Sequence, residues 1–346
     1  MALSKVDLAN QVENQLPQNL VANNLPFRNI IINGDMSIAQ RGTSVVGTTD
    51  GYKICDRWYF KRSVGTINLA QSAQVPTGQG FAQSFQVVVT SGASPSAGDR
   101  QYIEQRFEGQ NLQYLKKGTA NAESVTLSFW IKSSVTGTYI IQLYDVDNDR
   151  SISKSYTIDS ADTWEKKTIT FAGDTTGAFG NDNSHDLSLR FFLSAGTNYT
   201  SGTLQTSWAT NVNANQAVGQ VNFPATASNE LYLTGVQLEA GTTASDFEFL
   251  PYDVNLQRCQ RYYEEIYFAF KVPTEGVTDL ASAIGGIGYY SVTKRASPTV
   301  SRTDITTESV DTLSNTGYNI GIEFNGRVTS GTRSRWIGTA RADAEL

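Results

Sequence analysis

The stretch SVTLSFWIKSS, residues 124–134, repeats with a period of two residues. One set of alternate positions is entirely apolar (Val125, Leu127, Phe129 and Ile131), and the other set is Thr126, Ser128, Trp130 and Lys132. Because successive side chains of a strand point to opposite faces of its sheet, this pattern predicts a strand with one face in a core. The same pattern recurs at Leu187, Leu189, Phe191 and Leu193.

Further segments of this kind, separated by turn residues, continue from Arg28 to about Asp253, and the first of them is expected at Asn29–Asn33. No window between them has helical spacing, so the crossover helices of a parallel sheet are missing. Many short strands joined by turns are typical of an antiparallel β-sandwich or jelly roll. The sequence therefore predicts a mainly β protein whose sandwich spans residues 28–252.

The composition excludes several classes of partner. Of the 346 residues 17% are charged, the net charge is −6 and the pI is about 5.0. An acidic chain without a basic cluster cannot hold phosphate backbones, so we expect no nucleic-acid partner. The N-terminus lacks a signal-peptide core and no apolar run is long enough to cross a bilayer, so we expect a soluble protein made in the cytosol. Cys55 and Cys259 are expected to be buried, reduced thiols.

Residues 253–267 break the β pattern. Apolar positions spaced by three and four residues, as on one face of a helix, are Leu256, Cys259, Tyr263, Ile266 and Phe270. Two interpretations fit equally, a short coiled-coil connector between subunits or one amphipathic helix lying on its own sandwich.

The two ends of the chain form smaller units. Residues 268–346 are predicted to form a small β-rich domain that would be marginally stable alone, so we expect it to associate with copies of itself. Residues 1–27 form a separate segment with helical spacing, too short to bury itself, which either stays loose or packs on a partner.

Catalytic and metal-binding patterns are weak in this chain. Its one histidine, His185, has no nucleophile and carboxylate in a recognisable triad motif. Asp145, Asp147 and Asp149 match the start of a calcium-binding loop, but the glycine and the glutamate that the loop requires are absent. We therefore expect no enzymatic activity, no metal and no cofactor.

Sugar binding requires less, because an aromatic ring can stack on a sugar ring while polar side chains bind its hydroxyls. Trp130 and Tyr144 alternate out of phase with the core positions of their strands, and Trp208 lies in the long polar stretch 199–229, whose length suggests a functional loop or an interface. The glycan-binding candidates are Trp130, Tyr144, Trp208, Tyr289, Tyr290, Tyr318 and Trp336. The alternative for each is a structural role, since sandwich interiors and subunit interfaces also use Trp and Tyr.

Six motifs follow one another along the chain, namely NIIINGDMSIAQRG (29–42), YKICDRWYF (52–60), SVTLSFWIKSS (124–134), LYLTGVQLEAGTTASDFEFLPY (231–252), CQRYYEE (259–265) and ARADAEL (340–346). In this combination the chain resembles bacteriophage tail fibre or receptor-binding proteins, especially those of marine and cyanobacterial phages. Those proteins carry a jelly-roll domain similar to carbohydrate-binding modules. The resemblance covers about residues 28–266 and the last few residues.

The resemblance implies a non-enzymatic, homotrimeric component of the virion, made in the host cytoplasm. Its N-terminal segment would attach to a phage tail or baseplate protein, and the protein would adsorb to a host surface polysaccharide. Residues 253–267 would be the helical connector that leads each sandwich into a trimeric tip formed by residues 268–346. In similar jelly rolls the start of the domain and its last strand can together hold a structural calcium ion. Asn33, Gly34 and Asp35 match that start, but Thr234 and Gly235 stand where an acidic ligand would be expected, so no metal is assigned.

Two other functions stay open. A structural tail or baseplate element would use its jelly roll to bind neighbouring proteins instead of a glycan. A polysaccharide depolymerase would need a pair of catalytic carboxylates, and pairs such as Glu104 and Glu108 carry no pattern that marks them out.

Overall fold

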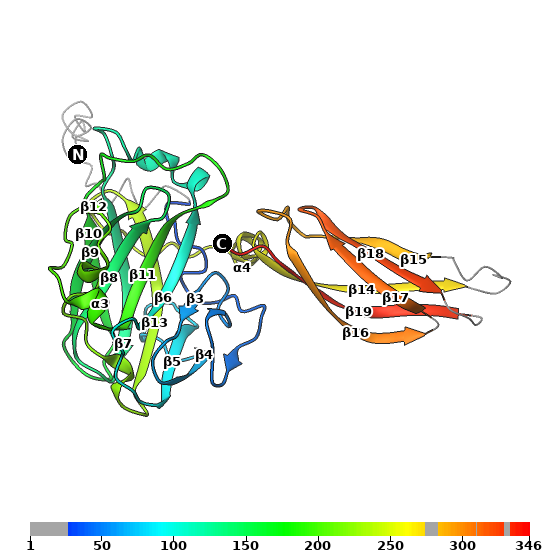
Figure 1. The fold of residues 1–346 in the computed structure, drawn as a ribbon, viewed down its shortest axis with the longest axis horizontal. Coiled ribbons are helices and arrows are strands. Elements are labelled where there is room, and N and C mark those ends of the chain that lie inside the picture. The colour runs from blue at the N-terminus through cyan, green and yellow to red at the C-terminus, as the bar shows by residue number, and fades with distance from the viewer. Residues whose placement is uncertain (1–26, 274–282, 309, 329–332) are drawn as a thin grey trace, which may run out of the picture.

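A computed structural model of the chain describes residues 27–273, 283–308, 310–328 and 333–346. A larger β-sandwich carries an elongated smaller β domain, and helix α4 (Tyr252–Gln260) lies at the junction (Figure 1). The structure confirms a mainly β protein with an antiparallel β-sandwich and a small β-rich C-terminal domain. No helix in this part of the chain has both the length and the hydropathy that a membrane crossing requires.

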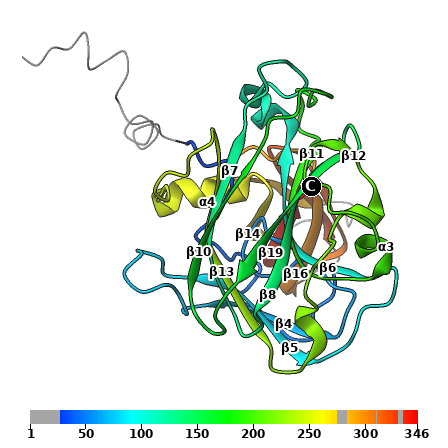
Figure 2. The same cartoon turned by 90° about the vertical axis from the view of Figure 1, so that its left-hand side faces the viewer.

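Two antiparallel sheets form the sandwich (Figure 1, Figure 2). The first sheet contains, in spatial order, β1 (Ser44–Val45), β4 (Thr66–Ser72), β5 (Ser84–Ser91), β13 (Glu230–Ala240), β7 (Val125–Ser133) and β10 (Glu165–Phe171). The second sheet contains β12 (Ala209–Thr210), β9 (Arg150–Ile158), β8 (Gly137–Asp145), β11 (His185–Ala195), β6 (Arg100–Glu108), β3 (Tyr59–Lys61) and β2 (Gly51–Tyr52). Short helices in the connecting loops are η1 (Gly109–Asn111), η2 (Gln113–Leu115), α3 (Thr197–Thr200), η3 (Asn213–Asn215) and η4 (Phe223–Ala225).

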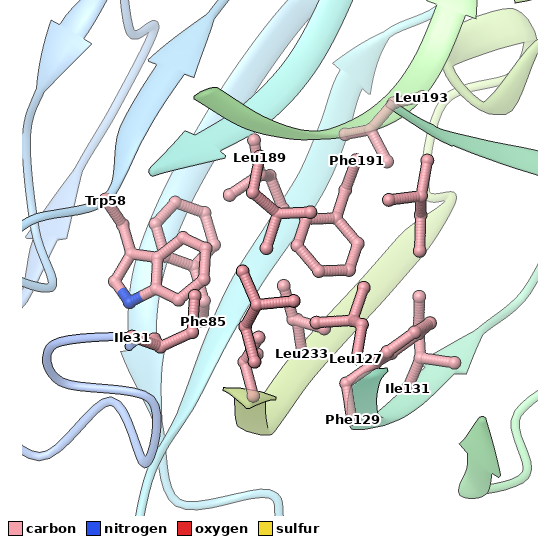
Figure 3. Close-up of a cluster of buried hydrophobic side chains, with 14 of the residues drawn as sticks. Ile31, Trp58, Phe85, Leu127, Phe129, Ile131, Leu189, Phe191, Leu193 and Leu233 are labelled. Carbon is pink, nitrogen blue, oxygen red and sulfur yellow. The ribbon is translucent and has the colours of Figure 1, made fainter. Parts of the chain in front are cut away.

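The two sheets enclose one hydrophobic core, drawn in part in Figure 3. From β7, Leu127, Phe129 and Ile131 enter this core, and each is at most 1% exposed. Phe191 of β11 meets Phe129 from the opposite sheet, with ring centroids 5.2 Å apart. Trp130 points away from the core and is half-buried. The period of two residues in β7 therefore separates a core face from an outer face, as its sequence predicts.

Residues 29–33 are not a strand, contrary to the prediction. Asn33 has a left-handed backbone with a φ of 59°, and its Nδ2 donates to the backbone oxygen of Asp56 at 2.9 Å. Gly34 lies so close to β13 that a Cβ atom there would be 2.1 Å from the carbonyl oxygen of Val236. A tight turn fixed by side-chain hydrogen bonds thus replaces the expected ladder at the start of the sandwich.

The long polar stretch 199–229 folds back over the outer face of the second sheet. The amide of Val221 donates to the carbonyl of Thr138 at 2.9 Å, and Ser153 Oγ donates to the carbonyl of Gln216 at 2.8 Å. An apolar cluster seals the contact and consists of Tyr102, Ile140, Phe192 and Ala217. The loop therefore covers part of one sheet face.

Two three-stranded antiparallel sheets form the C-terminal domain. The third sheet contains β14 (Tyr263–Pro273), β19 (Arg333–Asp343) and β16 (Thr299–Glu308), and the fourth contains β15 (Ala283–Tyr289), β18 (Gly321–Val328) and β17 (Val310–Gly317). The rings of Phe324 and Trp336 are fully buried between these sheets, with centroids 5.7 Å apart. This domain therefore has a small aromatic core of its own.

The prediction of a helical connector through Phe270 is wrong beyond Gln260, where α4 ends. Tyr263, Ile266 and Phe270 lie instead on β14, which pairs with β19 along its whole length. Ile266, Phe268 and Phe270 contact the core of the C-terminal domain at a spacing of two residues. The run YEEIYFAF satisfies both periods, and its aromatic and β-branched residues favour the strand once a partner strand is present.

The other two connector residues, Leu256 and Cys259, lie on α4. Cys259 is fully buried, and neighbouring Asn255 donates from Nδ2 to Asp35 Oδ1 of the sandwich at 3.2 Å. This part of the chain therefore follows the second interpretation, a helix lying on its own sandwich.

The last residues of the chain return to the sandwich and close the junction between the two domains. Ala344 donates its amide to the carbonyl of Tyr262 at 2.7 Å, and Glu345 forms an ion pair with Arg57. Arg57 is 1% exposed, and its guanidinium carbon lies 3.4 Å from the centroid of the Tyr262 ring. Parts of several motifs that carry the resemblance thus meet at one junction, where their role is structural.

Candidate functional site

The outer face of the first sheet has a cavity of about 190 Å³ beside Trp130. Three neighbouring strands and two loops surround it. The strands contribute Ser128, Trp130, Lys166 and Gly235, and the loops contribute Gly78, Gln79, Phe81, Asp246, Phe247 and Phe249. The cavity therefore combines aromatic rings with hydroxyl, amide and charged groups.

Trp130 reaches this cavity because its neighbours Phe129 and Ile131 point into the core. On either side of it, Lys166 of β10 and Thr234 of β13 are its register partners. The indole is thus held on a strand that is paired on both sides, and it keeps part of its surface in solvent.

Gly235 shapes the floor of the cavity. It has a φ of 60°, which favours glycine, and it lies in the register shift of β13 between Thr234 and Gln237. A Cβ atom at this position would be 2.5 Å from the ring of Phe81. Glycine therefore lets that ring lie directly against the strand.

Three phenylalanines from two loops form one wall. The centroid of Phe81 lies 5.0 Å from that of Phe247 and 5.1 Å from that of Phe249, and the last two are 4.8 Å apart. Phe249 is 51% exposed, which is unusual for so large an apolar side chain. The cluster thus offers ring surface to whatever enters the cavity.

The charged groups at the rim are available to a ligand. Lys166 and Asp246 are both exposed. Within the part of the chain that the structure describes, neither side chain forms an ion pair or a hydrogen bond. Ser128, by contrast, is 4% exposed at the base of the cavity.

A second aromatic group continues the same outer face. The rings of Trp164 and Tyr232 lie with centroids 6.3 Å apart, and Lys132 Nζ is 4.3 Å from the centroid of Tyr232. The hydroxyl of Tyr232 is held by Glu230 Oε2 at 2.5 Å and by Gln86 Nε2 at 2.9 Å. Tyr232 is only 4% exposed, so the ring that this group leaves partly in solvent is that of half-buried Trp164.

Sequence reasoning missed most of this site. Tyr232 alternates with Leu231 and Leu233 in the same way as Trp130 alternates with its neighbours, and this signal places it on the same outer face, although it is 4% exposed and does not line the cavity. Phe247 and Phe249 come from a loop, and only the folded chain brings them to Trp130.

Tyr144 lies on the outer face of the other sheet, away from the Trp130 cavity. Its ring lies 4.6 Å from the guanidinium carbon of Arg190, and its hydroxyl donates to Asp149 Oδ1 at 3.0 Å. Arg190 in turn pairs with Glu104 at 2.7 Å. Tyr144 is thus part of a polar network on the second sheet.

Trp208 is half-buried beside the main core of the sandwich. Its Nε1 donates to the carbonyl of Ala172 at 2.7 Å, and its ring packs against the main core. Its contacts are those of a structural residue.

The C-terminal candidates divide into two exposed and two buried residues. Tyr289 is 70% exposed and Tyr318 is 49% exposed. Both lie next to Gly321: Tyr289 is its register partner on the neighbouring strand, and the amide of Tyr318 donates to its carbonyl at 2.8 Å. Tyr290 is 9% exposed and Trp336 is 0% exposed. The prediction that these last two contact a glycan is wrong, because the core of the domain encloses their rings.

Among the described residues, no group of three or more His, Cys, Asp or Glu side chains could hold a metal ion. Asp35, at the start of the sandwich, accepts hydrogen bonds from Ser37 Oγ at 3.0 Å and Asn255 Nδ2 at 3.2 Å. His185 contacts Ser188 Oγ at 2.8 Å, and burial lowers the pKa of its imidazole to about 4, so it is neutral at pH 7.

No protein-family model matches the sequence, and the search of curated proteins finds no match. Among solved structures, the enzymatically active domain of bacteriophage CBA120 tailspike protein 4 is similar with a TM-score of 0.34 and 14% identity, over 62% of this chain and 22% of that one. A CBM4 structure is similar with a TM-score of 0.32 and 10% identity, over 60% of this chain and 97% of that one. TmCBM61 in complex with beta-1,4-galactotriose is similar with a TM-score of 0.30 and 9% identity, over 62% of this chain and 99% of that one. Likenesses this weak assign no function to the chain.

Proposed function

We propose that the protein binds a glycan on the outer face of its first sheet, with Trp130 as the central contact. The observation that carries this proposal is the half-buried indole beside a cavity whose wall adds the rings of Phe247 and Phe249. A sugar ring has C–H groups on its faces and hydroxyls at its edge, so it fits aromatic surfaces surrounded by unpaired polar groups. Lys166 and Asp246 are the groups placed to bind those hydroxyls.

Replacement of Trp130 by Ala tests the proposal. Stacking removes roughly 60 Å² of ring face from water, and at about 25 cal/mol per Å² this contributes about 1.5 kcal/mol. The dissociation constant for a glycan identified on an array should therefore rise about tenfold, measured by isothermal titration calorimetry.

The matched control is Tyr144→Ala, which removes an aromatic ring from the outer face of the other sheet. This variant should bind the glycan as tightly as the wild type does. An unchanged affinity in Trp130→Ala, or an equal loss in both variants, would contradict a site on the first sheet.

We further propose that glycan binding serves the adsorption of a phage to its host, with the protein as a tail fibre or receptor-binding protein of the virion. The support is the set of ordered motifs in residues 28–266 and at the C-terminus. In this proposal residues 1–27 attach to a tail or baseplate protein, three chains associate through the C-terminal domain, and the glycan is bound without being cleaved.

The virion role has its own tests. Light scattering should give a solution mass near three times 37.8 kDa, and a monomer would contradict the trimer. The purified protein should bind susceptible cells and compete with phage adsorption. Release of reducing ends from host polysaccharide would identify a depolymerase instead, and binding to tail proteins but not to cells would identify a structural element.

A further inference from the structure

A second cavity, of about 400 Å³, lies where α4 meets the edge of the sandwich. Strand β6 and helices η1 and η2 line one part of it, α4 with the residues that follow it lines another, and residues 27–32 line the rest. Its size falls in the range of small-molecule sites, about 300–1,000 Å³. The side chains that matter for its chemistry are Arg106, Glu108, Gln110, Tyr114, Arg258 and Arg261.

The negative charge of this cavity is already neutralised. Glu108 accepts hydrogen bonds from Arg261 Nε at 2.9 Å and Nη2 at 2.7 Å, and from the hydroxyl of Tyr262 at 2.5 Å. Arg106 is paired with Glu104 at 2.8 Å. Two of the three arginines therefore have carboxylate partners within the protein.

Arg258 has none. In the described parts of the chain its side chain forms no ion pair, and its hydrogen bond to the carbonyl of Asn29 is long, at 3.4 Å. Burial lowers the pKa of its guanidinium, and the nearby charge of Glu248, which acts in the opposite direction, does not offset this effect. The cavity thus contains a guanidinium that forms no ion pair among the described residues, on a helix that is packed against the sandwich.

We propose that this cavity binds the carboxylate of an acidic sugar, with Arg258 as its partner. A planar carboxylate matches the fork of a guanidinium, and it would form with Arg258 the direct ion pair that the described residues do not provide. The half-exposed ring of Tyr114 lines the same cavity and suits a sugar ring. Gln110 also lines it; its Nε2 donates to Glu108 Oε2 at 2.6 Å, and its amide oxygen can accept from a sugar hydroxyl. The inference rests on the proposed glycan binding and adds the class of glycan, a polysaccharide that contains uronic acids.

Arg258→Gln is the direct test, with galacturonic acid oligosaccharides and the neutral galactose oligosaccharides of the same length as probes. A charge-assisted hydrogen bond is lost, so affinity for the acidic probe should fall about 10- to 100-fold while affinity for the neutral probe stays the same. The matched control is Lys116→Gln, which removes one positive charge from an exposed side chain just after η2, outside the cavity. Affinity of the wild type for the acidic probe should also fall with added salt.

The fold of the variant is checked by its melting temperature, which should change little, because the substitution removes a partly buried charge that forms no ion pair among the described residues. Equal losses in Arg258→Gln and Lys116→Gln would reduce the effect to net charge and overturn the inference. Binding of acetate or inorganic phosphate as tightly as the acidic oligosaccharide would overturn the assignment to a sugar. If neutral glycans bind through Trp130 and acidic glycans do not bind, this inference alone is overturned. If no glycan of either kind binds, the proposed function is overturned as well.

Discussion

Glu104 is the carboxylate whose loss the structure predicts to be most costly to the sandwich. It is 0% exposed on β6, and it bridges two arginines, with Oε1 2.7 Å from Arg190 Nε and Oε2 2.8 Å from Arg106 Nε. Arg190 is itself 7% exposed. Replacement by Gln keeps the size and one acceptor oxygen but removes the charge that balances Arg190.

The magnitude follows from the pKa. Burial alone would raise the pKa of Glu104, but the charges of Arg190 and Arg106 outweigh it and lower the pKa from 4.5 to about 2. At about 1.4 kcal/mol for each unit of pKa, the ionised carboxylate stabilises the fold by about 3 kcal/mol. Removal of one partner of a buried ion pair typically costs about 3–5 kcal/mol, so the two estimates agree.

Urea denaturation followed by tryptophan fluorescence measures this cost. Of the five tryptophans, all but Trp336 lie in the sandwich, so the signal reports mainly on the domain that contains Glu104. With a slope of about 3 kcal/mol per molar urea, the midpoint of Glu104→Gln should fall by about 1 M. The matched control is Glu123→Gln, whose carboxylate pairs with Lys116 in the solvent and should cost less than about 1 kcal/mol.

The pH dependence of the stability tests whether Glu104 acts through its charge. Because the folded pKa lies below the unfolded one, the contribution of Glu104 is complete above about pH 5 and is lost as the pH falls from 4.5 towards 2. The stability difference between wild type and Glu104→Gln should therefore be full at pH 7 and shrink in that acidic range. A difference below about 0.5 kcal/mol at pH 7, or one that stays constant down to pH 3, would show that the buried carboxylate does not act through its charge.

Two further predictions concern the start and the end of the chain. Gly34→Ala places a Cβ 2.1 Å from the carbonyl oxygen of Val236 and should destabilise the protein by about 3 kcal/mol. The control Gly98→Ala, where the nearest atom to the added Cβ is 3.8 Å away, should leave the stability nearly unchanged. Thermal denaturation measures both variants, and equal melting temperatures would contradict the close approach at Gly34. Glu345→Gln removes the carboxylate that pairs with buried Arg57 and should lower the stability of the protein by about 3 kcal/mol. The control Asp343→Asn, at a side chain that is 46% exposed, should lower it by less than about 1 kcal/mol. Similar losses of stability in both variants would contradict a buried ion pair at the junction.

The connector shows where periodicity alone was insufficient. Residues 256–270 satisfy a helical spacing, and residues 266–270 also satisfy a spacing of two. A short segment with both patterns takes the structure that its partners allow, and β19 pairs with it from Tyr263 to Pro273. Since β19 begins at Arg333, its availability cannot be read from the connector itself.

The candidate residues show the same limit. Alternation within one strand places Trp130 on an outer face, because that direction depends only on the strand itself. It does not distinguish the half-buried Trp130 from Trp336, which is fully buried because the opposite sheet of its domain covers it.

The sequence by itself determined the fold class, the alternation of the sandwich strands and the outward direction of Trp130, because each depends on residues close together in the chain. Only the tertiary structure decided where α4 ends, which loops build the wall beside Trp130 and which arginine of the second cavity forms no ion pair among the described residues. The cavity at Arg258 forms where β6, η1 and η2 meet helix α4, which comes after all the sandwich strands in the sequence. Such a site is a property of contacts between distant segments, and those contacts exist only once the chain has folded.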